Sequence, residues 1–334
     1  MKTNFRTDLA IDIVENSKID GVLIDKYKEN GILVNNVYLD KVGSIKIGKK
    51  IGNYLTIEFN DILDSTTRRN IIKIFTKELK KMLNKLGIKE NDKCLVIGLG
   101  NKKSTPDSLG PSVVEKVVVT NHLFKMNMLE DGYRVVSAFN TGVMGTTGIE
   151  TKDLIDNLVK ISECDFLIVI DSLASGSIDR LNKTIQITDA GISPGSGIGN
   201  DRGEISSDTL NIPVIAIGVP TVVDAVTIVS DTINYMYKHY SYIKNNINNP
   251  SFKLKIGIGD YLKKEVYNEN LNKDVFGIIG SLNDSELKTL INEVLTPINY
   301  NLMVTPKEVD YIIDKLSNII SQVINNVLHK NNCV

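Results

Sequence analysis

The sequence predicts an α/β protein, a three-layer α/β/α sandwich around a mostly parallel central sheet, with a smaller α+β portion. Two observations lead to this prediction. Near-continuous apolar runs begin at Cys94, Arg134, Asp165 and Ile212, and such runs are typical of strands covered on both faces. Segments with helical periodicity lie between these runs, and an alternation of strand and helix favours a parallel sheet.

The chain before the central strands is expected to be rich in β structure. Across residues 31–60, apolar and polar residues alternate between glycines, and we expect short strands at Val42–Ile47 and Tyr54–Phe59. Apolar residues at helical spacing then predict a helix over Ile71–Leu86, which Gly87 ends. Between the central strands, helices are predicted over Ser112–Asn127, Thr151–Ser162 and Val222–Lys238.

The C-terminal third has a different texture. A polar segment at Lys244–Ser251 is followed by two capping-box sequences, Asn283 with Glu286 and Thr305 with Glu308. The second is expected to open a long helix with an apolar stripe from Val309 to Val327, which could serve the core or a subunit interface. We therefore predict a main domain at 9–240 and a C-terminal α+β region at 241–334.

Composition excludes several classes of function. The 334 residues carry 39 Lys and Arg against 40 Asp and Glu, so the net charge of −1 gives no general attraction to nucleic acid. No apolar run reaches the roughly 18 residues of a membrane helix, and the N-terminus lacks a secretory signal. Three scattered cysteines cannot form a disulfide framework. We expect a cytoplasmic protein that binds neither nucleic acid directly nor a membrane.

Carboxylates are the best candidates for catalysis, because the chain has only three His residues. In open α/β sheets the sites lie at the carboxyl ends of strands. Asp107 follows the first central strand, and the third and fourth run into Asp171 and Asp224. A desolvated carboxylate near a second one can share a proton with it, which suits acid–base work on an amide. Asn101 and Asn140 follow the first and second strands and are possible supporting residues.

Two glycine-rich segments do not predict a nucleotide site. Gly98-Leu-Gly100 follows a strand, but Lys103 stands where a dinucleotide fingerprint needs glycine. Gly195–Gly199 has the wrong spacing, and Ser172 and Ser175 have no nearby His to activate them. The sequence therefore indicates no cofactor and no metal.

Several long motifs, taken together and in order, make the chain similar to a known family. They are Gly98–Pro111, Ile170–Ser175, Ile192–Asn200, Gly218–Ala225 and Asn301–Asp310. These segments resemble the germination proteases of spore-forming bacteria, over nearly the whole chain from Arg6 to about Ile324. A more distant similarity, in the Gly-Leu-Gly-Asn segment with its following Asp, is to the peptidases that mature nickel hydrogenases.

The resemblance implies a fold and a function. The fold would be of the phosphorylase/hydrolase-like type, and the protein would be an atypical aspartic endopeptidase, a homotetramer in the forespore and spore core. Its substrates would be the small acid-soluble proteins that coat spore DNA. By motif, the catalytic pair falls on Asp107 and Asp171, the positions that the strand-end argument also favours.

The family is made as a zymogen that cuts itself, and the N-terminus offers a matching site. Family substrates are cut after Thr-Glu and before an apolar residue, Ala, any residue and an acid. Residues Thr7–Asp12 show this pattern with Asp in place of Glu. Cleavage is therefore expected between Asp8 and Leu9, which makes residues 1–8 a propeptide.

Two other functions remain open on the sequence. The first is a hydrogenase-maturation-type endopeptidase, which the scarcity of His near the strand ends disfavours. The second is a non-catalytic binding module on the same fold. Cleavage of a peptide containing Thr-Glu-Ile-Ala-Ser-Glu would separate the protease from the binding module.

Overall fold

The computed structural model describes residues 7–14, 19–195, 203–246, 248, 273, 276–295 and 302–330. The chain forms two compact units. Residues 6–222 and 305–334 form the first, here called the sheet unit, and residues 223–304 belong to the second, the helical unit. The helical unit begins at Val223, before the expected division at 240, and the last helix belongs with the large sheet and not with the segment before it.

Within the described residues, the sheet has nine strands and is mixed. An antiparallel series is formed by β1 (Val22–Glu29), β2 (Ile32–Leu39), β3 (Gly52–Glu58) and β7 (Thr184–Thr188). A parallel series is formed by β6 (Phe166–Ser175), β4 (Cys94–Leu99) and β5 (Val136–Gly142). Strand β8 (Val214–Asp224) lies between the two series, and β9 (Met303–Val304) pairs with its end.

This arrangement confirms an α/β fold and corrects the expectation of a mostly parallel sheet. The β-rich part at 31–60 continues the central sheet, because β3 pairs with β7. Strand β7 also pairs antiparallel with β8. Neither β1 nor β7 was among the predicted strands, since β7 has only five residues and the apolar run of β1 stops at Ile24.

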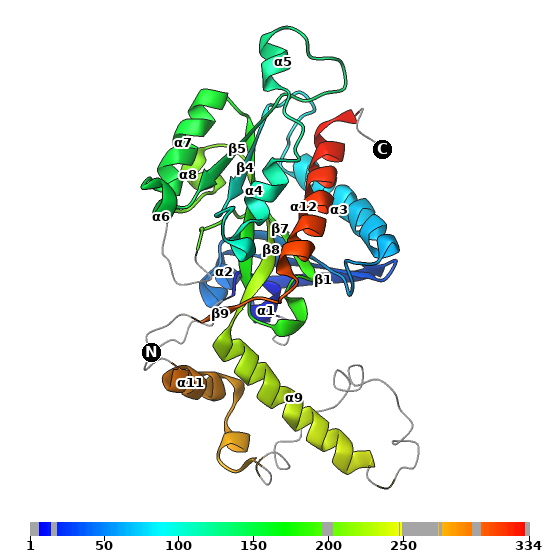
Figure 1. Cartoon of the computed structure of the whole chain (residues 1–334), viewed down its shortest axis with the longest axis vertical. Helices are drawn as coiled ribbons and strands as arrows, with labels where there is room; N and C mark the ends of the chain where they lie inside the picture. Colours follow the sequence, from blue (N-terminus) through cyan, green and yellow to red (C-terminus); the bar gives the residue numbers. More distant parts are fainter. Residues whose placement is uncertain are drawn as a thin grey trace. The chain divides into compact units, whose positions relative to one another are not determined.

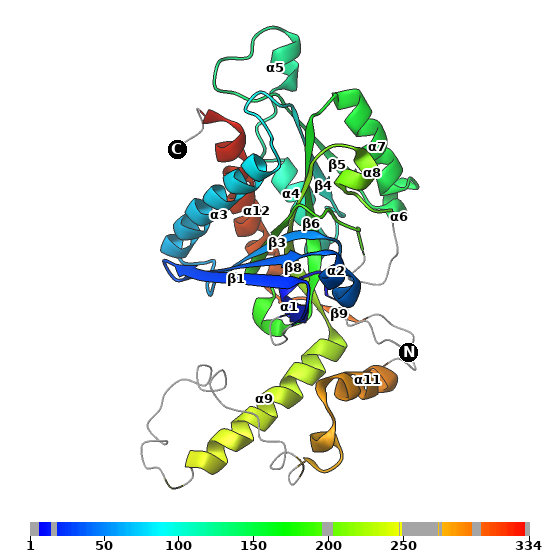
Figure 2. The same ribbon diagram turned by 180° about the vertical axis from the view of Figure 1, so that it is seen from behind.

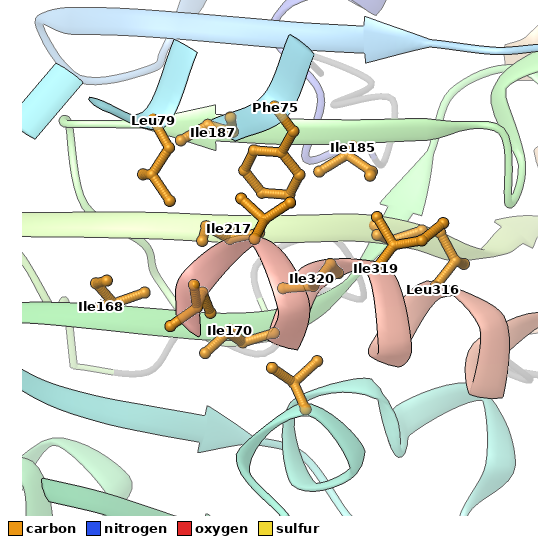
Figure 3. Packing of buried hydrophobic residues seen from close by; sticks show 14 of the residues in the cluster. Phe75, Leu79, Ile168, Ile170, Ile185, Ile187, Ile217, Leu316, Ile319 and Ile320 are labelled. Carbon is orange, nitrogen blue, oxygen red and sulfur yellow. The ribbon is translucent and has the colours of Figure 1, made fainter. Parts of the chain in front are cut away.

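Helices cover both faces of the sheet in the sheet unit (Figures 1 and 2). On one face, α3 (Ser65–Lys85), α4 (Leu109–Val114) and α12 (Val309–Leu328) form a core with the strands. Figure 3 shows Phe75 and Leu79 of α3 and Ile320 of α12 against isoleucines of the strands. On the other face, Leu167 and Val169 of β6 pack with Ile155 of α7 (Thr151–Ser162).

The long apolar stripe of α12 is buried in this core, as its periodicity predicted. Ile320 and Val323 are fully buried, and the helix packs on α3 and α4. Of the two roles left open for this helix, the structure shows the core role. Its start differs from the prediction: Thr305 makes no capping box, because its hydroxyl donates to the Thr221 carbonyl (2.8 Å) and the helix begins later, at Val309.

Two predicted elements are wrong for local reasons. Val42–Ile47 lies in the helix α2 (Lys41–Ile47), because the Asp40 carboxylate caps the N–H groups of Val42 and Gly43. The helix predicted over Ser112–Asn127 divides into α4 and α5 (Asn121–Lys125). Thr120 interrupts it by exchanging hydrogen bonds with the start of β5, through its N–H to the Val136 carbonyl and its hydroxyl to the Arg134 carbonyl.

The helical unit contains α9 (Ala225–Asn246), which starts later than the predicted Val222 because β8 extends to Asp224. Helix α11 (Asp284–Leu295) packs on it, and the predicted capping box between Asn283 and Glu286 is confirmed at 2.9 Å in both directions. Among the described residues, the sheet unit also has the short helices α1 (Ile11–Val14), α6 (Met144–Thr147) and α8 (Ser207–Leu210) and the 3-10 turns η1 (Thr105–Asp107) and η2 (Ile178–Arg180), and the helical unit has the 3-10 turn η5 (Ile279–Ser281).

Candidate functional site

The end of β4 and its glycines bring the loop of Asp107 onto the sheet. Gly98 pairs with Ile170 of β6 on one side and with Asn140 of β5 on the other. A Cβ at Gly98 would lie 2.5 Å from the Gly110 carbonyl, and one at Gly110 would lie 2.7 Å from the Ile170 carbonyl. Only glycine allows this contact, so these residues let the start of α4 rest directly on the two strands.

Asp107 is half-buried at the end of η1, in the loop between β4 and α4. Its carboxylate accepts the N–H of Asn101 (2.9 Å), and Gly100 has a φ of +106° that lets the chain pass against the Asp107 carbonyl. The hydroxyl of Thr221 in β8 donates to the Pro106 carbonyl (2.6 Å). The loop is therefore tied to the sheet, and η1 contacts β6.

Asp171 lies within β6 and not at its end, because the strand continues to Ser175. Its side chain is 6% exposed, and one of its oxygens accepts the N–H of Ser172 (2.8 Å). Alternation along the strand places it on the same face as Val169 and Leu173. Asp107 at the end of η1 and Asp171 in β6 therefore lie on two elements that contact each other.

The supporting residues predicted from the sequence fall in different places. Asn101 contributes its backbone N–H to Asp107, and Asn140 lies beside Gly98 with a buried side-chain oxygen that has no hydrogen-bond partner among the described residues. Asp224 belongs to the helical unit, where its carboxylate accepts the N–H of Val226 (2.8 Å) at the start of α9. This hydrogen bond satisfies a backbone N–H in the first turn of α9.

The N-terminal segment lies against β6 beyond Asp171. The N–H of Asp8 donates to the Ala174 carbonyl (3.0 Å), and the Asp8 carboxylate accepts the Ala174 N–H (2.8 Å). The N–H of Leu167 donates to the Pro213 carbonyl, on the β8 side of β6. Because successive N–H groups of a strand point to opposite sides, the N–H groups of even-numbered residues such as Ala174 point to the β4 side. Asp8 therefore binds β6 beyond Ile170, on the side where the pairing with β4 has ended.

The residues that follow Asp8 are buried, and the carboxylate of Asp12 among them is held by hydrogen bonds. Leu9 and Ala10 are fully buried in a small core with Leu173. The Asp12 carboxylate accepts three hydrogen bonds: from the hydroxyl of Thr7 (2.6 Å), from the N–H of Gly176 (2.7 Å) and from the Arg180 guanidinium (2.7 Å). Both acids of the Thr7–Asp12 pattern are thus held by the segment around the end of β6.

The carbonyl of Asp8, which belongs to the predicted cleavage bond, accepts two side-chain donors. Lys49 Nζ lies 3.0 Å from this oxygen and Gln186 Nε2 lies 3.2 Å from it. A cavity of about 330 Å³ lies beside Asp8 and is lined by both donors, together with Leu173 and Gly218.

Comparison with known proteins gives the family. The sequence model described as germination protease matches residues 5–333. Germination proteases of Bacillus cytotoxicus and Bacillus licheniformis are 47% and 46% identical to the chain, covering 97% and 98% of it and 93% and 94% of their own lengths. The chain belongs to the germination protease family. The predicted protease activity in spore germination is thereby confirmed, and the two alternative functions are disfavoured.

A solved structure gives a weaker likeness. The NiFe hydrogenase maturation protease HycI from Thermococcus kodakarensis KOD1 is 13% identical, with 43% of this chain and 80% of that one covered and a TM-score of 0.28. No argument follows from a score this low. The family assignment therefore depends on the sequence relatives alone.

Two of the three cysteines of this germination protease family member are described by the structure. Cys94 and Cys164 are buried, and burial raises the pKa of both thiols, so they act as core residues. No cluster of three His, Cys, Asp or Glu side chains that could bind a metal occurs in the described part of the chain. None of the helices described here combines the length and apolar character of a membrane span.

Four residues of the site were missed by the sequence analysis: Lys49, Gln186, Gly176 and Arg180. Lys49 stands in a Lys-Lys pair after a helix, and Gln186 is the one polar side chain between the two isoleucines of β7. Both patterns are common on solvated surfaces, so neither carries a signal. The alternation in Thr184–Thr188 would have predicted a strand, but not that Gln186 meets the N-terminus.

Proposed function

We propose that this germination protease starts the breakdown of small acid-soluble spore proteins in the spore core, and that it is made as a zymogen cut between Asp8 and Leu9. Asp107 and Asp171 are the catalytic pair. One observation carries the proposal: Asp8 is bound to Ala174 on the edge of β6, three residues beyond Asp171. The bond to be cut thus follows a residue that is held by β6, the strand that carries one of the two candidate acids.

The chemistry needs two carboxyl groups in different protonation states. One ionised aspartate takes a proton from water while the water oxygen attacks the carbonyl carbon of Asp8. The other aspartate, protonated, gives its proton to the nitrogen of Leu9 as the C–N bond breaks. The first product then ends in the carboxyl group of Asp8, and the second begins with the amine of Leu9. The aspartate that was ionised now carries the proton, and the one that was protonated is ionised.

Substrate choice follows from the contacts of the N-terminal segment. Ala174 binds the acid before the cut, and Gly176 with Arg180 binds the acid four residues after it. The small core with Leu173 takes the apolar residue and the alanine between them. A substrate segment with the same order of acid, apolar residue, alanine and acid would meet the same contacts.

The assembly and the location are further parts of the proposal. We expect a homotetramer in the spore core, without direct binding of nucleic acid or membrane. Helix α9 supports self-association, because Val229, Met236 and Ile243 recur at seven-residue spacing and are all exposed. A three-layer arrangement is supported by the burial of β4 and β6 on both faces. Light scattering of the purified protein would give the mass of the assembly.

The test uses the full chain and a separate peptide. Mass determination of the purified protein over time should show loss of residues 1–8. The processed protein should then cut a peptide containing Thr-Glu-Ile-Ala-Ser-Glu between the first Glu and Ile. A protein that never loses this segment contradicts the zymogen part, and a processed protein that leaves the peptide intact contradicts the substrate part.

A further inference from the structure

The cleavage bond is held by two side chains that no part of the acid–base mechanism uses. Lys49 and Gln186 both donate to the carbonyl oxygen of Asp8, at 3.0 and 3.2 Å. Lys49 also reaches the Thr7 carbonyl, at the longer distance of 3.4 Å. An amide oxygen inside a protein commonly accepts a backbone donor. Here it accepts a charged one and a neutral one, which arrive from different elements.

Gln186 holds the peptide groups on both sides of Leu9. Its Nε2 donates to the Asp8 carbonyl, and its Oε1 accepts the N–H of Ala10 (3.0 Å). The Gln186 backbone is fixed inside the sheet, opposite Thr56 of β3 and Gly218 of β8, and its side chain is 6% exposed. The Gln186 side chain therefore holds the peptide bond between Asp8 and Leu9 in one orientation.

Lys49 supplies a positive charge at the same oxygen. It follows Gly48, which ends α2 in the left-handed conformation (φ 74°), and this turn directs it toward the N-terminal segment. Burial lowers the pKa of Lys49, and the charges of Asp8 and Asp12 oppose that shift. A desolvated ammonium gains most from an additional negative charge nearby, because the local dielectric constant is low. The adjacent Lys50 is different, since it pairs with Glu204 and Asp208.

We propose that Lys49 and Gln186 form the oxyanion-binding site of this protease, with Lys49 as a further catalytic residue. The inference rests on the proposed cleavage between Asp8 and Leu9. When water attacks the Asp8 carbonyl carbon, the electron pair of the C=O double bond moves to the oxygen. That oxygen becomes negative while it is held by both donors. The pair returns to re-form the double bond as the C–N bond breaks and Leu9 takes a proton.

The charge on this oxygen exists only during the reaction, so a charged donor stabilises the transition state more than the bound substrate. Removal of one such donor typically lowers kcat by about 10²–10³. A residue with a merely structural role would change the stability of the fold and would leave the rate of the folded protein unchanged.

The experiment compares four full-length proteins by the rate at which residues 1–8 are lost: wild type, Lys49→Met, Lys49→Arg and Lys50→Met. Lys49→Met should process at least about 100-fold more slowly than wild type. Lys49→Arg keeps the charge and should recover much of the rate, and Lys50→Met, the matched control, should process normally. Thermal unfolding of each protein, measured beside the rate, shows whether it is folded.

The outcomes separate this inference from the proposed function. A folded Lys49→Met protein that processes at the wild-type rate overturns the role of Lys49 and leaves the cleavage site standing. A slow Lys49→Met with an equally slow Lys50→Met also overturns it, since general charge loss would explain both. If Lys49→Met does not fold, a Lys49→Arg protein without activity contradicts the inference. If wild type cuts a peptide but never between Asp8 and Leu9, the zymogen proposal and this inference both fall.

Discussion

The parallel and antiparallel halves of the sheet contribute different groups to the candidate site. The parallel half supplies the acids, Asp107 after β4 and Asp171 in β6. The antiparallel half supplies the donors to the cleavage carbonyl, Gln186 in β7 and Lys49 just before β3. The expectation that sites lie at the carboxyl ends of strands therefore identifies only the acids of such a site and not the donors. It concerns parallel strands and gives no reason to search an antiparallel series.

The largest expected effect comes from the parallel half. Asp171→Asn or Asp107→Asn keeps the shape of the side chain but removes its ability to exchange a proton. Self-processing and peptide cleavage should each fall by at least about 10²-fold. Asp25→Asn, on the exposed β1, is the control and should behave as wild type. Full activity in either variant would remove that aspartate from the mechanism.

The next effect comes from the antiparallel half. Gln186→Met is close in size but can neither donate to the Asp8 carbonyl nor accept from Ala10. Processing should slow by about 10²-fold, as for other lost oxyanion donors. The rate is measured by timed mass spectra of the folded protein. A wild-type rate would mean that this half only shapes the groove.

A smaller effect is expected at the far end of the N-terminal segment. Arg180→Met removes the guanidinium from Asp12, both side chains being largely buried (11% and 4% exposed). The low end for a hydrogen bond to a charged group is about 1.5 kcal/mol, and a loss of this size should slow processing by about tenfold. Lys183→Met changes an exposed cation nearby and should have no effect. Equal rates in the two variants would show that Asp12 is not part of recognition.

The smallest effect tests the stability of the parallel half. His329 is fully buried beside β5, with Nδ1 accepting the Arg134 N–H (3.2 Å), and burial, with the nearby Arg134 charge, lowers its pKa. The unfolded chain has an ordinary His pKa of about 6.5, so it binds a proton that the folded protein refuses. The free energy of unfolding should therefore fall as pH drops below about 6.5.

His329→Gln serves as the comparison for this effect. Denaturant unfolding of both proteins between pH 7.5 and 5.5 should give a weaker pH dependence for the variant. Identical pH dependences of the free energy of unfolding would show that His329 binds a proton equally well in the folded and the unfolded protein.

Much of the fold could be predicted from periodicity. The stripes of α3 and α12, the strands β4 and β6 and the helix α7 each combine a long apolar pattern with burial, so the pattern suffices. The helix at Lys41–Ile47 could not be predicted, because one capping carboxylate at Asp40 outweighs a short alternating run. The mixed sheet was also missed, since strand direction depends on which strands meet and not on local sequence.

The site was predictable to a different extent. Asp107 and Asp171 were predicted from strand position and motif and remain the candidate pair, although β6 continues beyond Asp171 to Ser175. Asp224 follows an apolar strand in the same way but starts a helix in the other unit. Lys49 and Arg180 act through contacts across more than forty residues of sequence, so no local pattern announces them.

The decisive experiment determines by mass the residue at which each of two purified proteins, wild type and Asp171→Asn, begins. Wild type should convert to a chain that begins at Leu9, and the variant should keep residues 1–8. A wild-type chain that begins at another residue, or an Asp171→Asn chain that loses residues 1–8 at the normal rate, would contradict the account.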